Sequence, residues 1–344
     1  MSTVGPANLE AAGGVSPRDR DYPSLPMLEL RADSPGRRSI RWIVTACALM
    51  AAVIAFAAAA HATARPLRAI TSTTPRSVRI VAVGDIACAP GFPVELGQCQ
   101  QVATAQLARS LHPAAALMLG DLQYESAATR EWAAFGASWG SLPFPLHPVA
   151  GNHEYQTPRA AGYYRHFGTR AGKARSGWYA FDLGAWRIYA LNSNCSIVAC
   201  SNGWMQQTWL REDLANHPRA CVLAMWHHPR FSSGEHGNSP WMTPIWTTLQ
   251  RAHADVVLQA HDHDYERFRR LLADGTPSQH GITSFVAGTG GRSRPLVKRR
   301  AAGSQTIVEK RFGVLALTLG DRSYAWRFEG IDGQTPDSGS ARCS

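Results

Sequence analysis

Residues 115–124, with the sequence AALMLGDLQY, join a short apolar run to a turn that begins with Gly-Asp. The stretch Val78–Asp85, VRIVAVGD, has the same form, and Pro145–Glu154, PLHPVAGNHE, is a third apolar run that ends in a turn. Short apolar runs bounded by turn residues are typical of buried strands. The segments between them, Gln98–Leu111 and Thr129–Trp139, have apolar residues at helical spacing. This alternation of strand and helix predicts an α/β fold.

The second half of the chain continues the same alternation. Two apolar segments around Gly184 predict a hairpin, and helical spacing recurs in Trp204–Asn216 and Pro240–His253. Further strands are predicted within residues 220–229, 254–267 and 284–291 and, as a hairpin, within 312–328. We therefore expect one domain over residues 77–330, with two sheets and helices outside them, followed by a C-terminal tail at 331–344.

The N-terminal part differs in composition from this domain. Residues 1–39 are rich in Pro, Ser and Gly without apolar periodicity, which is typical of a disordered tail. The run Trp42–Ala60 has 19 residues and no charge, close to the length that a membrane-spanning helix needs. Arginines directly before it predict a cytoplasmic tail and an exported C-terminal domain. Residues 40–62 are thus expected to be a signal anchor in the cell membrane, with a linker at 63–76.

A cleaved signal peptide is the alternative to the anchor. Small residues around Ala62 and Ala64 would suit a signal peptidase, and cleavage near either of them would release a secreted protein. Both alternatives place the C-terminal domain outside the cytoplasm.

The seven cysteines are compatible with export, because disulfides persist in oxidising compartments. Two pairs flank short loops and can each close a local disulfide: Cys88 with Cys99 and Cys195 with Cys200. Cys221 lies in an apolar strand pattern and is predicted to be a buried thiol. Cys343, near the chain end, is expected to be free or to pair with Cys221.

Several function classes find no support in the sequence. The chain has no G-x-S-x-G elbow of a serine hydrolase and no phosphate loop of the G-x-x-x-x-G-K-[ST] type. The net charge of +10 favours phosphate anions or acidic surfaces. Because the arginines are scattered without an aromatic stacking platform, no nucleic acid is predicted as a specific partner.

Residues that can bind metals follow five of the predicted strands. They are Asp85, Asp121, Asn152 with His153, His227 with His228, and His261 with His263. Sites in open α/β sheets lie beyond the carboxyl ends of the strands, so these side chains are expected to converge. Carboxylate and amide oxygens mixed with imidazoles suit iron, manganese or zinc.

The order of these motifs resembles the calcineurin-like metallophosphoesterases and, within them, the purple acid phosphatases. The motifs are GD at 84–85, GDLQY at 120–124, GNHE at 151–154, HHP at 227–229 and AHDH at 260–263. The wider superfamily has Asp-x-His at its first motif, whereas Ala87 stands at that histidine here. The purple branch has instead a tyrosine three residues after the second aspartate, which is Tyr124 here.

The resemblance implies a four-layer α/β/β/α sandwich that holds two metal ions. Asp121 would bridge both ions. Asp85, Tyr124 and His263 would complete the first site, which resembles a ferric site. Asn152, His227 and His261 would complete the second site, for Fe(II), Zn(II) or Mn(II).

The resemblance also implies the chemistry, in which a metal-bound hydroxide attacks the phosphorus of a phosphomonoester. His153 would bind the phosphoryl oxygen or protonate the leaving group, and His236 resembles a substrate-facing loop histidine. Two other functions stay open. One is an extracytoplasmic phosphodiesterase acting on nucleotides, lipid head groups or envelope polymers, and the other is a non-catalytic binding module.

Overall fold

The computed structural model describes residues 77–173, 176–293, 297 and 299–344. The predicted tail, membrane segment and linker, residues 1–76, lie outside the described residues. In the described part of the chain, no helix has the length and apolar character to cross a membrane.

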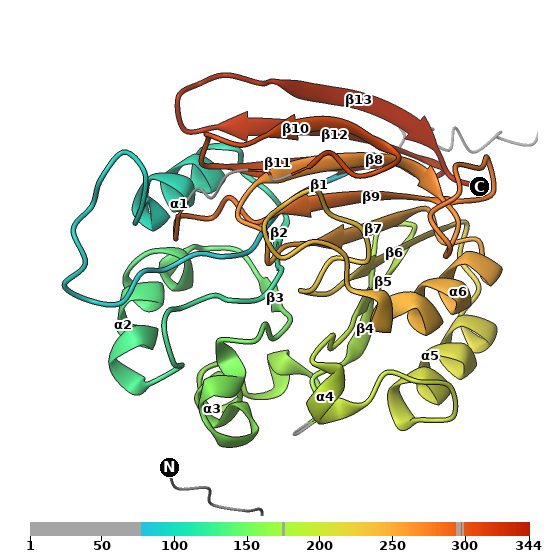
Figure 1. Cartoon of the computed structure of the whole chain (residues 1–344), viewed down its shortest axis with the longest axis horizontal. Helices are drawn as coiled ribbons and strands as arrows, with labels where there is room; N and C mark the ends of the chain where they lie inside the picture. Colours follow the sequence, from blue (N-terminus) through green and yellow to red (C-terminus); the bar gives the residue numbers. More distant parts are fainter. Residues whose placement is uncertain (1–76, 174–175, 294–296, 298) are drawn as a thin grey trace, which may run out of the picture. The chain divides into compact units, whose positions relative to one another are not determined.

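The first sheet has six strands in the order β13-β12-β11-β1-β2-β3 (Figure 1). Strands β1, β2 and β3 run parallel, whereas β11, β12 and β13 pair antiparallel. The bounds are β1 Val78–Val83, β2 Ala115–Met118, β3 Leu146–Pro148, β11 Gly313–Leu319, β12 Ser323–Gly330 and β13 Asp337–Arg342.

The second sheet has seven strands in the order β10-β8-β9-β7-β6-β5-β4. Its central strands β5, β6, β7 and β9 are parallel, with antiparallel strands at both edges. The bounds are β4 Tyr179–Leu183, β5 Trp186–Ala190, β6 Cys221–Met225, β7 Val256–Gln259, β8 Tyr265–Leu271, β9 Ile282–Ala287 and β10 Ser304–Val308.

The two sheets pack face to face, with helices on their outer faces. Alternation along β1 directs Ile80 and Ala82 into the core between the sheets and Val81 and Val83 toward helices α1 to α3. Helices α5 and α6 pack on the second sheet (Figure 1). The helices are α1 Gln101–Ser110, α2 Thr129–Ala137, α3 Ala161–Phe167, α4 Cys195–Val198, α5 Met205–Asn216 and α6 Thr243–Arg251. The predicted pair of sheets with helices outside is confirmed.

Short 3-10 turns complete the described elements. They lie at Trp139–Ser141, Glu154–Gln156, Pro158–Ala160, Gly168–Ala171 and Pro240–Met242. The segment predicted as one strand with an exit loop, residues 254–267, holds β7, a turn and the first residues of β8. The sequence patterns did not predict α3, α4, β10 and β13.

The prediction of a C-terminal tail at 331–344 is wrong, because β13 is an edge strand of the first sheet. It pairs with β12 from Asp337 to Arg342. The buried Asp337 carboxylate accepts hydrogen bonds from Tyr265 Oη at 2.6 Å and Arg267 Nε at 2.8 Å. These contacts attach a strand whose sequence, DSGSAR, has no apolar pattern.

Three disulfides lie within the described residues. The two local bridges, Cys88–Cys99 and Cys195–Cys200, are confirmed. Cys221 pairs with Cys343, so the prediction of a buried thiol at Cys221 is wrong. The pairing with the chain end was the alternative left open, and β13 makes it possible by carrying Cys343 to β6.

Candidate metal centre

The predicted ligands converge at the carboxyl ends of strands from both sheets. Asp85, Asp121 and Asn152 follow β1, β2 and β3 of the first sheet. His227 follows β6 of the second sheet, and His261 follows β7. The parallel direction of these strands places all the turns at the same edge, as the sequence predicts.

The turns after these strands have an unusual backbone. Asp85, Asp121 and His261 have φ values of 57°, 48° and 73°, in the left-handed region that residues with a side chain rarely adopt. Strained backbone of this kind collects at functional sites, where the surrounding fold maintains it.

Two glycines let the chain approach the carboxylates closely. A Cβ atom at Gly151 would overlap Asp121, and one at Gly288 would lie 2.5 Å from Asp85 Oδ2.

The first cluster of side chains surrounds Tyr124. Its hydroxyl lies 2.8 Å from Asp85 Oδ1, 3.1 Å from His263 Nε2 and 3.4 Å from Asp121 Oδ2. His263 Nε2 is also 3.5 Å from Asp85 Oδ1. Four potential ligand atoms thus face one point.

The second cluster surrounds His227 Nε2. This atom lies 3.2 Å from Asp121 Oδ2, 3.2 Å from Asn152 Oδ1 and 3.1 Å from His261 Nδ1. Asp121 Oδ2 belongs to both clusters, so a single carboxylate group joins them. The structure thus brings together all seven residues that the sequence predicts as ligands.

Hydrogen bonds outside the clusters fix the imidazole orientations. His227 Nδ1 donates to the carbonyl of Leu119 at 2.8 Å, which leaves Nε2 facing the second cluster. His263 Nδ1 lies 2.7 Å from Ser293 Oγ, which leaves its Nε2 facing Tyr124. Orienting contacts of this kind are usual for histidines that bind metals.

The electrostatics of the bare side chains indicate that cations fit here. Burial raises the pKa of Asp85 and of Tyr124 well above their ordinary values. Burial also opposes a charge on His227, yet the neighbouring Asp121 carboxylate raises the pKa of His227 to about 9. Burial lowers the pKa of His263 to about 3, so that its nitrogen is neutral and can bind a cation. The carboxylate, phenol and amide oxygens and the imidazole nitrogens are donors that suit iron, manganese or zinc, and a cation would take the place of the proton on His227.

A hollow of about 170 Å³ opens over the two clusters. Its lining consists of Asp121, Tyr124, Glu125, Asn152, His153, His236, His261, His263, Arg292 and Ser293. Both histidines predicted to face the substrate, His153 and His236, are among these residues.

The two histidines are held in different ways. The His153 ring lies 4.3 Å from the Tyr124 ring, its Nε2 is 3.9 Å from Asp121 Oδ2, and its Nδ1 contacts the carbonyl of Glu125 at 2.5 Å. Asp262 holds His236 twice, accepting from the backbone N–H at 2.8 Å and contacting Nδ1 at 3.0 Å. Both rings therefore have a defined position beside the clusters.

Arg292 is the residue of the site that the sequence indicated least. It follows the GTGG turn at 288–291 and is not among the residues that the sequence predicts for the site. Its guanidinium lies 5.1 Å from the centre of the Tyr124 ring and forms an ion pair with Glu125. The GTGG turn directly before Arg292 is the feature of the sequence that could have indicated its position. This turn brings the Arg292 backbone N–H within 3.0 Å of the Asp85 carbonyl, to which it donates a hydrogen bond. Arg294 lies outside the described residues.

Two further residues of the motifs lie beside the clusters. Glu154 is buried and accepts hydrogen bonds from the backbone N–H groups of Asp121, Leu122 and Gly151. One nitrogen of His228 lies within 4.8 Å of nitrogen atoms of His227 and His261. His228 Nδ1 is 2.8 Å from Ser193 Oγ.

Comparisons with known proteins agree with this geometry. Purple acid phosphatase 18 of Arabidopsis thaliana is 25% identical over 199 residues, which cover 53% of this chain and 45% of the relative. Purple acid phosphatase 22 of the same plant is 28% identical over 231 residues, which cover 60% of this chain and 52% of the relative. The chain thus spans about half the length of the curated relatives it matches.

The solved structure of the purple acid phosphatase PPD1 from yellow lupin (Lupinus luteus) seeds has the same fold. The TM-score is 0.67 at 17% identity, over 78% of this chain and 54% of that chain. The family model for calcineurin-like phosphoesterases matches residues 78–265, from β1 to the start of β8, and so contains all seven residues of the two clusters. The chain therefore belongs to the calcineurin-like phosphoesterase family.

Proposed function

We propose that the protein is a metal-dependent hydrolase of phosphoric monoesters, similar in chemistry to purple acid phosphatases. The observation that carries the proposal is the pair of ligand clusters that share Asp121 Oδ2. A shared carboxylate between an oxygen-rich cluster and an imidazole-rich cluster is suited to two adjacent cations.

The residues divide between two ions. Asp85, Tyr124 and His263, with Asp121, would hold ferric iron, because a phenolate ligand calls for a strong Lewis acid. Asn152, His227 and His261, with Asp121, would hold iron(II), zinc or manganese. When bound, the pair supplies Lewis acidity to phosphate oxygens and lowers the pKa of bound water.

The chain's own groups around the hollow bind and protonate the ester. His153 Nε2 faces the shared carboxylate and can donate a hydrogen bond to a phosphoryl oxygen or a proton to the departing alcohol. Arg292 adds a fixed positive charge beside the Tyr124 ring, which favours the negative charge of a phosphate group. His236, held by Asp262, also lines the hollow.

The test is metal analysis combined with a substrate pair. Purified domain should bind two metal ions, lose hydrolysis of p-nitrophenyl phosphate on chelation and regain it when iron with zinc or manganese is returned. Full metal content without hydrolysis of any phosphate ester would contradict the proposal and favour the non-catalytic binding module.

A phosphodiesterase is the second candidate, and a wide groove beside Asn152 favours it, because that groove leaves space for a second ester substituent. Hydrolysis of bis-p-nitrophenyl phosphate at a higher kcat/KM than p-nitrophenyl phosphate would select this alternative.

We also propose that the domain acts outside the cytoplasm. The apolar run Trp42–Ala60 with its preceding arginines and the three disulfides support export. Protease added to spheroplasts should digest the domain. Protection in intact spheroplasts, with cleavage after lysis, would contradict this location.

A further inference from the structure

A large groove lies beside the metal centre. It is a groove of about 970 Å³, between the segment that contains α4 and the start of α6. We call it the tryptophan groove, and its lining consists of Asn152, Tyr155, Gln156, Ser193 to Ile197, Ala199 to Ser201, Trp204, His228, Pro240, Trp241, Thr243 and Pro244. Ligand sites for small molecules commonly have about 300–1,000 Å³, so the groove is large enough for one.

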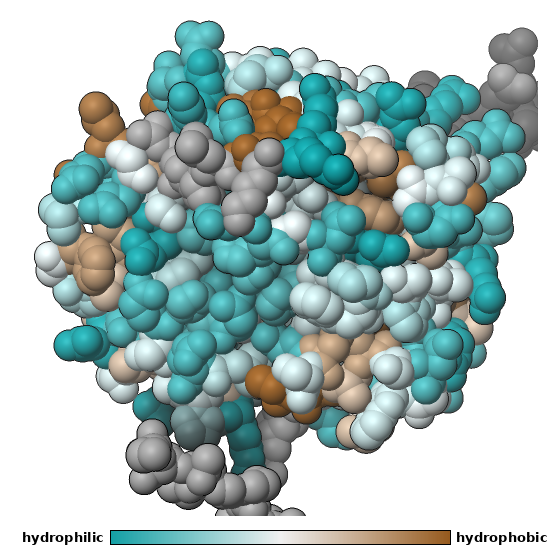
Figure 2. Space-filling model, in the orientation of Figure 1, coloured by the Kyte–Doolittle hydropathy of each residue, from teal (hydrophilic) through white to brown (hydrophobic). Residues whose placement is uncertain are grey.

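The walls of the tryptophan groove expose unusually large apolar side chains. Trp204 is 55% exposed, Trp241 is 48% exposed and Ile197 is 56% exposed. Figure 2 shows that the face it displays is mostly hydrophilic and that apolar surface forms small separate patches, one of them over α4. Exposed aromatic side chains around a concave site offer stacking surfaces for a flat ligand.

The tryptophan groove also has no formal charge. None of its lining residues is Asp, Glu, Lys or Arg, although the chain as a whole carries a net charge of +10. An uncharged, partly aromatic lining disfavours a ligand part with further phosphate or carboxylate groups.

The groove is continuous with the metal centre. Asn152 lines both the tryptophan groove and the hollow over the ligand clusters. The His228 ring lies 4.5 Å from the His261 ring on one side and 6.0 Å from the Trp241 ring on the other. The hollow alone, at about 170 Å³, suits a phosphate group, so the rest of a larger ester extends into the groove.

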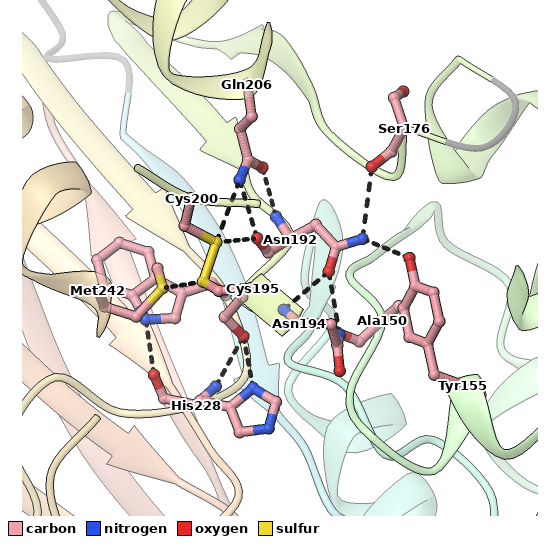
Figure 3. Close-up of a disulfide and its surroundings, with 12 residues drawn as sticks. Ala150, Tyr155, Ser176, Asn192, Asn194, Cys195, Cys200, Gln206, His228 and Met242 are labelled. Carbon is pink, nitrogen blue, oxygen red and sulfur yellow. Dashed lines mark hydrogen bonds between the residues drawn. A yellow bond between two sulfur atoms is a disulfide. The ribbon is translucent and has the colours of Figure 1, made fainter. Parts of the chain in front are cut away.

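Contacts within the chain hold one wall of the groove in place. The Cys195–Cys200 disulfide closes the α4 segment, and Gln206 holds Asn192 through Oε1 at 2.8 Å and Nε2 at 2.9 Å (Figure 3). A preformed wall lowers the ordering cost of binding.

One imidazole of the groove has a fixed orientation. His228 Nδ1 lies 2.8 Å from Ser193 Oγ, which also accepts the His228 backbone N–H at 3.0 Å. The other ring nitrogen, Nε2, therefore lies on the side of the ring away from Ser193.

We propose that the tryptophan groove is the leaving-group subsite and selects phosphate monoesters whose alcohol is uncharged and aromatic. The inference rests on the proposed phosphatase function and adds its substrate class. The aromatic ring lies between Trp204 and Trp241, with the phosphate in the hollow.

The test compares 1-naphthyl phosphate with glycerol phosphate in the holoenzyme. Trp241→Ala and Trp204→Ala should each lower kcat/KM for the naphthyl ester about tenfold, mainly through KM, and change kcat/KM for glycerol phosphate less than twofold. Ile331→Ala is the matched control, because Ile331 is exposed but does not line the groove. Metal content should be the same in all variants.

A second measurement does not depend on turnover. Binding of 1-naphthylphosphonate, whose P–C bond is not hydrolysed, should weaken about tenfold in either tryptophan variant, whereas binding of methylphosphonate should stay the same.

Equal effects of the variants on kcat/KM for both esters, or no effect on either, would overturn the subsite. A selective loss of activity toward bis-p-nitrophenyl phosphate alone would also overturn it, since the groove would then hold the second arm of a diester. A holoenzyme that hydrolyses neither ester would refute the phosphatase function, while the phosphonate titrations would still decide the groove.

Discussion

At the scale of single residues, Asp121 is the side chain on which both clusters depend. Its Oδ2 faces His227 and Tyr124, while its Oδ1 accepts the backbone N–H of His153 at 2.9 Å. Asp121→Asn keeps the size but removes the negative charge shared by two cations. We expect a loss of hydrolysis by at least about 100-fold and reduced metal content with an unchanged fold. Kinetics with p-nitrophenyl phosphate, elemental analysis and circular dichroism are the measurements. If Asp121→Asn retains more than half of the wild-type activity at saturating metal, the assignment of Asp121 as the shared ligand is contradicted.

A substitution at Tyr124 distinguishes a ferric centre, which absorbs visible light, from a colourless centre of other metals. Its hydroxyl is buried 2.8 Å from Asp85 Oδ1, and burial makes its own ionisation unfavourable. Binding as a phenolate therefore needs a strong Lewis acid such as ferric iron, and phenolate-to-iron charge transfer absorbs visible light. Oxidised, iron-loaded protein should be violet to pink, and Tyr124→Phe should remove the band. A colourless, fully active, iron-replete enzyme that is indifferent to Tyr124→Phe would exclude the ferric assignment.

The sequence could predict the ligands but not everything that positions them. Ligands follow apolar runs directly, so the strand pattern alone places Asp85 and Asp121 together. The positions of Arg292 and Asp262 depend on loop paths, which apolar periodicity does not describe. His236 is held in the hollow only because Asp262, between two ligands, points toward its loop.

At the scale of secondary-structure elements, strands with continuous apolar runs were predictable and β13 was not. The stability of β13 comes from long-range polar contacts of Asp337, which no local pattern reveals. Burial opposes ionisation of Asp337, yet hydrogen bonds from Arg267 and Tyr265 lower its pKa below the ordinary value. A carboxylate of this kind stabilises the fold above the pKa of the unfolded chain, and the contribution is lost as the pH falls through the lower, folded value.

Asp337→Asn should therefore lower the free energy of unfolding by about 2 kcal/mol at pH 7, because it leaves Arg267 partly buried without its partner. The difference from wild type should shrink below about pH 4, and urea titrations at several pH values would measure it. Asp332→Asn is the matched control, since Asp332 pairs with Arg311 at the surface and exposed pairs contribute less than about 1 kcal/mol. Equal effects of the two substitutions would contradict this account of β13.

At the scale of the whole molecule, the Cys221–Cys343 bridge joins the two sheets. Cys343 follows β13 of the first sheet, and Cys221 begins β6 of the second, 122 residues earlier in the chain. His227 lies beyond the other end of β6. Removing the bridge is therefore expected to affect stability and leave the metal centre intact.

The double variant Cys221→Ala with Cys343→Ala tests this separation. Loss of a long disulfide loop should lower the free energy of unfolding by about 2–5 kcal/mol. Thermal unfolding should show the loss, whereas kcat and metal content at 25 °C should equal those of wild type. A reduced metal content in the folded variant would show that the bridge and the metal centre are coupled.

The hydrogen bonds of Glu154 affect how the protein takes up cations. Its carboxylate ties the turns after β2 and β3 through the backbone N–H groups of Asp121 and Gly151, with bonds of 2.9 and 2.7 Å. Because these bonds come from the chain itself, we expect the ion receptor to be preorganised, so that uptake of cations needs no refolding. Mixing apoprotein with zinc in a stopped-flow instrument should give a single phase whose rate rises linearly with zinc concentration. A rate that levels off at high zinc would reveal a slow rearrangement, and Glu154→Gln should introduce one.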